Sequence, residues 1–220
     1  MLKNIAHQTR ITIIVITVVV LVLIGLVVYE VRKVSAENAT GAGSVSAVRD
    51  DSHRLNPGGD DKVTLVEFLD FECEACGAAY PVIEDLRETY GDRVSFVVRY
   101  FPIDSHANAR NAAHAVEAAA RQNMLEPMYK RMFDTQIEWG ESQKSQADRF
   151  RGYAEDLGLD LEQYDRDVVS PEVAERVQSD VDDGMALGVS GTPTFFLNGE
   201  RLEPQSTEDF TTAIEDALAG

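Results

Sequence analysis

The sequence VTLVEFLDFECEACG, residues 63–77, decides the fold. Its first nine residues are mostly β-branched, aromatic or otherwise apolar, a pattern that predicts a strand buried on both faces of a sheet. Glu67 is the exception, because it places an acidic side chain in the middle of the strand. A helix is predicted over residues 73–89, so Cys73 and Cys76 lie where the buried strand passes into this helix.

The remainder of the body extends this pattern. Residues 94–100, VSFVVRY, predict a second buried strand, so that strand, helix and strand form a right-handed parallel βαβ unit. Residues 105–187 are helical in pattern and punctuated by glycine and proline, which predicts a helical insertion. A hairpin over residues 194–202 and a closing helix over residues 207–218 complete a ββα unit. The predicted fold class is therefore α/β.

Charge narrows the classes of function. The chain has 20 Lys and Arg against 38 Asp and Glu, a net charge of −18, and 44% hydrophobic residues, which are enough for a packed core. Such a negative field repels the phosphate backbone of nucleic acids, and no cluster of basic residues offsets it. Nucleic-acid binding is therefore disfavoured.

Cys73 and Cys76 are the only cysteines of the chain, and three interpretations compete for them. A structural zinc site needs four ligands, and the four histidines show no spacing that completes one. Two unlinked thiols in the core are a second interpretation. A redox dithiol is favoured, because a C-x-x-C pair beside a βαβ unit is typical of thiol-disulfide chemistry.

The position of each cysteine predicts its role. At a helix start, the sulfur of Cys73 meets unpaired backbone N–H groups and the positive end of the helix dipole, which stabilise a thiolate. Cys73 is therefore predicted to be the nucleophile, and Cys76, on the same helix face, to resolve the mixed disulfide. Glu67 is placed to exchange a proton with Cys76 through water, and the alternative is an edge position where Glu67 faces solvent.

An apolar run precedes the body. Residues 11–29 contain no charge and are long enough to span a hydrocarbon core of about 30 Å, so they are predicted to be a transmembrane anchor after a cytoplasmic N-terminus, residues 1–10. A cleaved secretory signal is the alternative. Residues 30–59 are predicted to be a flexible linker, within which residues 45–55 add an edge strand.

Dithiol chemistry suits an oxidising compartment, and this decides the expected orientation. The predicted localisation is the cell membrane, single-pass, with the N-terminus in the cytoplasm and the catalytic domain, residues 60–220, extracytoplasmic. A cleaved signal exports the same domain.

Several segments together resemble the DsbA-like branch of the thioredoxin superfamily. They are VEFLDFECEACG, RYFPID with His106 just after it, the helical insertion, and GVSGTPTFFLNG. The resemblance covers about residues 60–220 and implies a thioredoxin fold with a central mixed sheet. It also implies that Pro193 follows a cis peptide bond and faces the dithiol. His106 is interpreted as a helix-start or packing residue rather than a proton carrier.

The resemblance implies a site without a metal or a separate cofactor, in which the Cys73–Cys76 disulfide is the redox group. The backbone of Thr192, freed by the proline that follows it, would hold an incoming peptide strand beside Cys73. The predicted catalytic residues are Cys73, Cys76, Glu67, Thr192 and Pro193.

The sequence departs from the family between the cysteines. Many members carry Pro followed by His or Tyr there, and this chain has Glu74 and Ala75. Glu72 and Glu74 flank Cys73, so they are expected to disfavour its thiolate by like-charge repulsion. The consequence is an expected weaker oxidant than the CPHC-type enzymes, because a less stable thiolate makes the disulfide harder to reduce.

The predicted function is an extracytoplasmic thiol-disulfide oxidoreductase that transfers the Cys73–Cys76 disulfide to exported proteins. Its expected partners are exported proteins with free thiols and a membrane oxidase that regenerates the disulfide, and the protein is expected to be monomeric. The alternatives are a reductase or isomerase that uses the same site, and a thioredoxin-fold binding module without catalysis.

Overall fold

The computed structural model describes residues 45–56 and 62–220. The predicted cytoplasmic N-terminus, residues 1–10, the predicted anchor, residues 11–29, and most of the predicted linker lie outside these residues. Residues 46–56 and 62–220 belong to one compact unit, Ser46–Gly220.

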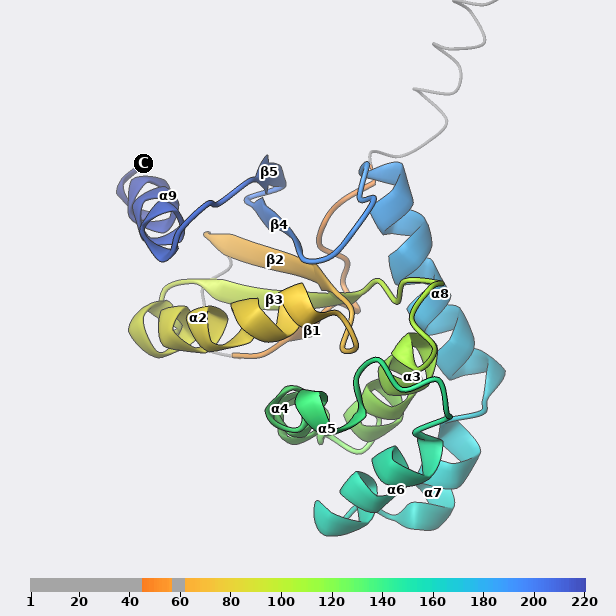
Figure 1. Ribbon diagram of the computed structural model, residues 1–220. Coiled ribbons are helices and arrows are strands. Elements are labelled where there is room, and N and C mark those ends of the chain that lie inside the picture. The colour runs from red at the N-terminus through yellow and green to blue at the C-terminus, as the bar shows by residue number, and fades with distance from the viewer. Residues whose placement is uncertain (1–44, 57–61) are drawn as a thin grey trace, which may run out of the picture. The chain divides into compact units, whose positions relative to one another are not determined.

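A five-stranded mixed sheet has the strand order β1-β3-β2-β4-β5 (Figure 1). The central strand β2 (Thr64–Leu69) is parallel to β3 (Ser95–Tyr100) and antiparallel to β4 (Thr194–Leu197). The edges are β1 (His53–Arg54), antiparallel to β3, and β5 (Glu200–Leu202), antiparallel to β4. Every residue of β2 and β3 is buried, as their apolar sequences predict, and the expected α/β fold with a mixed sheet is confirmed.

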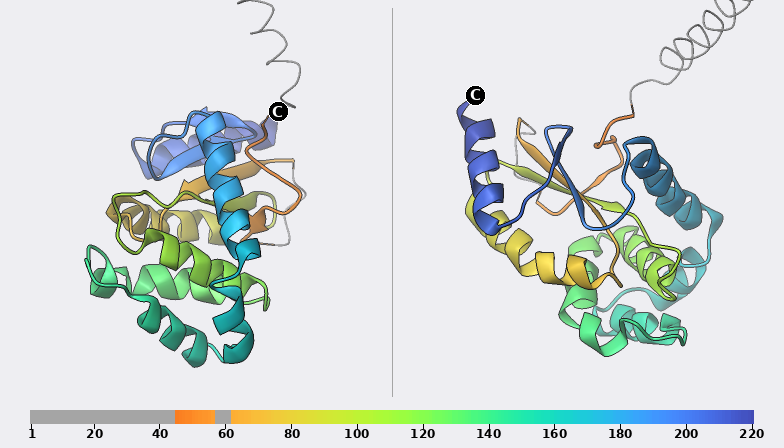
Figure 2. Two further views of the ribbon diagram at one scale, coloured as in Figure 1. Left: turned by 90° about the vertical axis from the view of Figure 1, so that its right-hand side faces the viewer. Right: turned by 45° about the horizontal axis from the view of Figure 1, so that its top comes forward.

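Side chains of β2 alternate between two hydrophobic clusters, because successive residues of a strand point to opposite faces of a sheet. Leu65 and Leu69 belong to a large cluster that also holds Cys76 and residues of α2 (Glu74–Tyr90) and α9 (Thr207–Ala219). Val66 and Phe68 belong to a smaller cluster on the other face, with Val181 of α8 (Pro171–Ala186). Figure 2 shows the sheet between these two sets of helices.

The predicted helical insertion is present between β3 and β4. It consists of α3 (Ala109–Ala120), α4 (Leu125–Asp134), α5 (Gln136–Trp139), α6 (Ala147–Asp156), α7 (Leu161–Asp167) and α8 (Pro171–Ala186). The start of α8 follows a common pattern, since the Ser170 side chain accepts a hydrogen bond from Val173 N and Pro171 occupies the first turn. The insertion covers one end of the sheet, beneath the start of α2 (Figure 1).

Residues 46–55 belong to the domain rather than to a flexible linker, which moves the domain start before residue 60. Ala47 and Leu55 are 3% and 2% exposed, and β1 is the edge strand expected in this region. The reason is a buried arginine that the sequence did not reveal. Arg99 of β3 is fully buried and donates to the backbone oxygen of Ala47 at 2.8 Å and to Asp180 of α8 at 2.5 Å.

Candidate active site

The two cysteines lie at the junction of β2 and α2, as predicted. Cys73 is the N-cap residue of α2, with extended backbone angles (φ −69°, ψ 121°), and its carbonyl accepts a hydrogen bond from Gly77 N at 3.0 Å. Cys76 lies in the first turn of α2 and is fully buried. Both thiols are free, so the structure shows the reduced dithiol.

The environment of Cys73 stabilises its thiolate. The pKa of Cys73 is lowered to about 5, chiefly because the Cys76 thiol hydrogen-bonds to its sulfur. Burial opposes this shift, and Thr192 together with the backbone N–H groups of Ala75 and Cys76 reinforces it. A thiol with this pKa is almost entirely ionised at neutral pH and is therefore a ready nucleophile.

Cys76 has the opposite environment. Burial raises its pKa well above the ordinary value, and the hydrogen bond to Cys73 and the negative charges of Glu67 and Cys73 raise it further. The dithiol thus contains one stable thiolate and one thiol that keeps its proton. This asymmetry agrees with the predicted roles of nucleophile and resolving thiol.

The loop before β4 faces the dithiol. The Thr192-Pro193 peptide bond is cis, as the family resemblance implied. The Cys73 sulfur lies 3.4 Å from the backbone oxygen of Thr192, so this loop contacts Cys73 directly. The Thr194 hydroxyl donates to Gly191 O at 2.7 Å and closes the turn around the proline.

Glu67 is buried inside the domain, which excludes the edge position facing solvent. It is 4% exposed and lies between Val98 of β3 and Phe195 of β4 in the sheet. The pKa of Glu67 is raised to about 8, chiefly by burial and further by the charge of Cys73. Glu67 is therefore a protonated acid at neutral pH that interacts electrostatically with both cysteines.

Asp70 organises the turn that carries the cysteines, and the sequence analysis missed it. Its carboxylate is 1% exposed and accepts hydrogen bonds from Glu72 N at 2.8 Å and Ile103 N at 2.9 Å. His106 Nδ1 lies 2.7 Å from the same carboxylate. The available signal is an acidic residue at the end of a buried strand, three residues before Cys73 of the C-x-x-C motif.

His106 is held beside the dithiol by this contact. Burial alone would lower its pKa, but the hydrogen bond to Asp70 and the negative charges of Asp70, Cys73 and Glu72 outweigh burial and raise it. The negative charges around His106 therefore stabilise its protonated form, and its ring binds the Asp70 carboxylate at the loop after β3.

The expected destabilisation of the Cys73 thiolate by Glu72 and Glu74 stays a prediction, and the structure shows where the Glu72 side chain is bound. The carboxylate of Glu72 is buried and accepts a hydrogen bond from Asn108 N at 2.6 Å, at the start of α3. Glu72 therefore connects the cysteine turn to the start of α3. The pKa of Cys73 is lowered overall. The comparison with CPHC-type enzymes stays a prediction.

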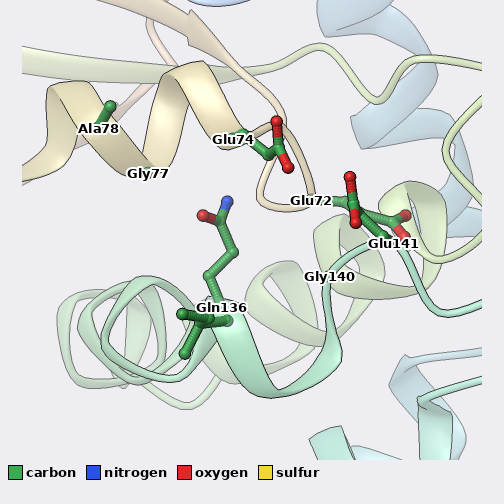
Figure 3. A pocket seen from close by; sticks show the side chains of 8 residues that line it. Glu72, Glu74, Gly77, Ala78, Gln136, Gly140 and Glu141 are labelled. Carbon is green, nitrogen blue, oxygen red and sulfur yellow. The ribbon is translucent and has the colours of Figure 1, made fainter.

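Glu74 does lie close to another carboxyl group, that of Glu141. The pKa of Glu74 is raised, first because its side chain hydrogen-bonds to Glu141 and then by the charge of Glu141. A cavity of about 310 Å³ lies beside these residues (Figure 3). A second cavity, of about 410 Å³, is lined by Cys73, His106 and Glu141 among others, and it gives access to the nucleophile.

Within residues 45–56 and 62–220 no group of three His, Cys, Asp or Glu side chains is arranged to hold a metal ion.

Comparisons with known proteins identify the family. Residues 59–216 match the family described as Thioredoxin, and the chain belongs to it. A thioredoxin-like oxidoreductase from Silicibacter pomeroyi DSS-3 has a similar structure, with a TM-score of 0.67 and 27% identity over 81% of this chain and 98% of that chain. The fold, the dithiol and the family match together place the chain in the thioredoxin superfamily.

Two further solved structures share the fold at lower identity. BdbD from Bacillus subtilis has a TM-score of 0.64 and 21% identity, over 74% of this chain and 91% of that chain. Alpha-DsbA1 from Wolbachia pipientis has a TM-score of 0.68 and 18% identity, over 78% and 93%. These two structures show the shared fold, and the family match over residues 59–216 confirms the thioredoxin-superfamily part of the expected resemblance.

Curated relatives at higher identity are longer proteins. The Na(+)/H(+) antiporter NhaA of Herminiimonas arsenicoxydans is 39% identical over 158 residues, which are 72% of this chain and 24% of that protein. The Na(+)/H(+) antiporter NhaA 3 of Salinispora tropica is 40% identical over 159 residues, 71% of this chain and 23% of that protein. The chain thus spans about a quarter of the length of these relatives.

These relatives contradict the predicted localisation as a single-pass cell-membrane protein with an extracytoplasmic catalytic domain. Their name is that of an antiporter, and the match covers only about a quarter of it. In addition, none of the helices in the described part of the chain is long and apolar enough to cross a membrane. The apolar run on which the prediction rested lies outside that part.

Proposed function

We propose that this protein is a thiol-disulfide oxidoreductase that acts as a disulfide donor, transferring the Cys73–Cys76 disulfide to pairs of thiols in protein substrates. The observation that carries the proposal is the stabilised thiolate of Cys73 at the start of α2, beside a Cys76 thiol that keeps its proton. A stable thiolate favours the reduced form of the enzyme, so the disulfide form is readily reduced by substrate and acts as an oxidant.

The transfer proceeds in two exchange steps. A substrate thiolate attacks the Cys73 sulfur of the enzyme disulfide, which forms a mixed disulfide and expels Cys76 as a thiolate. Glu67, with a pKa of about 8, is the acid that protonates the departing Cys76 through water. The second substrate thiolate then attacks the substrate sulfur of the mixed disulfide and expels Cys73, which leaves as its stable thiolate.

Each transfer leaves the enzyme reduced, so a second protein must restore its disulfide. The substrate loses two electrons and gains an S–S bond, and the enzyme dithiol holds those two electrons. One proton from the substrate thiols ends on Cys76 and the other passes to solvent. A thiol oxidase that accepts electrons from the dithiol must then regenerate the disulfide, and we propose such a protein as the second partner.

The substrate chain is proposed to lie beside the loop that contains Thr192. The backbone of Thr192 is within 3.4 Å of the Cys73 sulfur, so a peptide strand joined to Cys73 passes next to it. Main-chain hydrogen bonds of this kind bind many sequences, because they do not depend on side chains. This supports a range of protein substrates rather than one.

The direction of transfer is tested by equilibrating the full chain in graded ratios of reduced and oxidised glutathione and counting free thiols by mass. A reduction potential above about −200 mV is expected for a disulfide donor. A value near about −270 mV, as in thioredoxin, would instead establish the reductase or isomerase alternative. A pair that never closes would leave only the binding module.

Turnover is tested by trapping. The Cys76→Ala variant is first converted to its Cys73–glutathione mixed disulfide. A thiolate of a reduced, unfolded protein then attacks the Cys73 sulfur and expels glutathione, and the covalent adduct is expected to accumulate because no resolving thiol remains. Cys73→Ser removes the more reactive sulfur and is expected to trap far fewer. Equal trapping by both variants would contradict the assignment of Cys73 as the nucleophile.

A further inference from the structure

One side chain of the helical insertion bonds directly to the turn that carries the cysteines. Gln136, the first residue of α5, donates hydrogen bonds from Nε2 to the backbone oxygen of Phe71 at 2.8 Å and to that of Cys73 at 2.9 Å. Figure 3 shows its side chain reaching from α5 toward the first turn of α2. These two carbonyls lie on either side of Glu72, so one amide group holds the whole turn.

The opposite side of the amide fits against a glycine. A Cβ atom at Gly77 would overlap Oε1 of Gln136. Gly77 lies within α2, and its backbone is not in the left-handed region that favours glycine. The space for the Gln136 amide is therefore the structural reason for a glycine directly after Cys76.

Buried packing fixes α5, the helix that carries Gln136. Trp139, at the end of α5, is fully buried, and its indole lies edge-on to Phe150 with ring centroids 4.9 Å apart. Its Nε1 donates to Met132 O at 3.3 Å, which ties α5 to α4. Gln136 is thus a rigidly placed donor rather than a flexible surface side chain.

The turn held by Gln136 also sets the surroundings of the sulfur. The backbone N–H groups of Ala75 and Cys76 hydrogen-bond to the Cys73 sulfur. They lie two and three residues after Cys73, whose carbonyl oxygen accepts the hydrogen bond from Gln136. The same turn aims the sulfur at Thr192 O. A shift of the Cys73 carbonyl therefore moves the sulfur relative to both sets of groups.

We propose that Gln136 is a positioning residue for thiol-disulfide exchange, which keeps the Cys73 sulfur on the backbone N–H groups of α2 and facing Thr192. The inference rests on the proposed function, because the chemistry that it serves is exchange at Cys73. It also gives the helical insertion a role in the chemistry, since the insertion supplies the donor that shapes the redox turn.

The first test replaces Gln136 with Met, which keeps the length of the side chain and removes both hydrogen bonds. Two quantities are measured on the full chain: the titration of the Cys73 thiolate by its absorbance near 240 nm, and the equilibrium constant of the dithiol with glutathione. The pKa of the Cys73 thiol is expected to rise. The glutathione equilibrium is expected to shift about three- to tenfold toward the disulfide, because the thiolate loses stabilisation comparable to one hydrogen bond.

Gln122→Met is the matched control. Gln122 also belongs to the insertion and bridges backbone groups, donating to Asp160 O at 3.0 Å and accepting from Asp160 N at 2.8 Å. This variant is expected to unfold more easily but to keep the wild-type titration and glutathione equilibrium. If Gln136→Met likewise lowers only stability, its role is purely structural and the proposal is overturned.

A double-mutant cycle tests whether Gly77 acts through Gln136. Gly77→Ala pushes the amide away without removing it, so it should shift the Cys73 titration in the same direction as Gln136→Ala. The double variant should match Gln136→Ala alone, because the clash no longer exists. Additive shifts would overturn this account.

The proposed function and this inference fail in different ways. A wild-type dithiol that forms no disulfide with glutathione would contradict the proposed function. The titration of Cys73 would still report on Gln136, because it needs no exchange partner. An unchanged titration in a folded Gln136→Met variant overturns the inference whatever the wild-type potential is.

Discussion

His106 Nδ1 lies 2.7 Å from Oδ2 of Asp70, and this contact joins the loop after β3 to the turn that carries the two cysteines. Because a carboxylate only accepts hydrogen bonds, His106 is the donor. The same carboxylate accepts hydrogen bonds from Glu72 N and Ile103 N. One buried acid therefore binds both the cysteine turn and the loop after β3, which line the cavity at Cys73.

Asp70→Asn is predicted to destabilise the domain. The amide can replace only part of the accepting capacity, and its own N–H groups would face backbone donors in a buried site. We expect the free energy of unfolding to fall by about 2–4 kcal/mol, the range for losing hydrogen bonds to a buried charge. Denaturant unfolding measures this, with Asp92→Asn as the control, since the Asp92 side chain is 81% exposed. A loss no greater than in the control would refute the structural role of Asp70.

The His106 contact predicts a pH dependence of stability. The folded-state pKa of His106 is raised, because the hydrogen bond and charge of Asp70 outweigh the opposing effect of burial. A raised pKa means that the folded state holds the proton more tightly, so the stabilisation is complete below the unfolded pKa of about 6.5 and is lost as pH rises through the folded pKa.

Unfolding of the wild type and of His106→Gln should be compared between about pH 5 and 9. The advantage of the wild type is expected to be largest at the acidic end and to shrink as pH rises. An NMR titration of the His106 ring gives the folded pKa directly. A stability difference that does not vary with pH would show that His106 acts only by packing.

Glu67→Gln is predicted to stabilise the protein and to slow exchange. The folded pKa of Glu67 is about 8, chiefly because of burial, while an unfolded glutamate ionises near 4.3. Between these values only the unfolded state loses the proton, so stability falls as pH rises through this window. Glutamine removes this penalty, and a gain on the order of 3 kcal/mol is expected at pH 7, vanishing below about pH 4.

The rate of disulfide transfer by Glu67→Gln separates a role in proton transfer from a role in packing. Without an acid near Cys76, disulfide transfer to a reduced peptide should slow by roughly 10²-fold or more, and its pH profile should lose the inflection near 8. Glu88→Gln, on the exposed face of α2, is the control and should change neither quantity. A wild-type rate in Glu67→Gln would remove Glu67 from the mechanism.

Much of this arrangement could be predicted from the sequence where the signal is local. The apolar run of β2 and the spacing of Cys73 and Cys76 predicted the buried strand and the helix start, because both depend on neighbours in the chain. The cis bond before Pro193 followed from the family resemblance. Glu67 stood out because a single acid interrupts an apolar strand.

The contacts that complete the site have no local signal. Arg99 meets Asp180 across 81 residues of sequence, and Asp70 meets His106 across 36. The sequence does not show which partner each of these residues meets, because only the folded sheet brings the two together. Gln136 was missed for the same reason, because a glutamine in a helical insertion carries no pattern that points to Cys73.

The stability of the reduced protein is predicted to depend on the Cys73 thiolate. The folded pKa of about 5 lies below the unfolded value of about 8.5, chiefly because Cys76 hydrogen-bonds to the sulfur. A depressed pKa gives stability that is complete above the unfolded pKa and is lost as pH falls through the folded pKa. The reduced form should therefore lose stability relative to the oxidised form as pH falls from about 8 to 5, because the oxidised form has no thiolate. Parallel denaturant curves of both forms measure this difference, and a constant difference would contradict the stabilised thiolate.

Glu74→His is predicted to make the disulfide a stronger oxidant. In the wild type the side chain of Glu74 lies against Glu141, and the charge of Cys73 also contributes to the raised pKa of Glu74. A histidine removes this negative charge and can place a positive one beside the thiolate, which stabilises the reduced form. Because the position is exposed, the glutathione equilibrium should shift only roughly two- to fivefold toward the dithiol, and the shift should shrink in high salt. Glu88→His, also exposed on α2, is the control for adding a histidine to this helix. An unchanged or lower reduction potential in Glu74→His would show that the residue between the cysteines does not tune the dithiol through its charge.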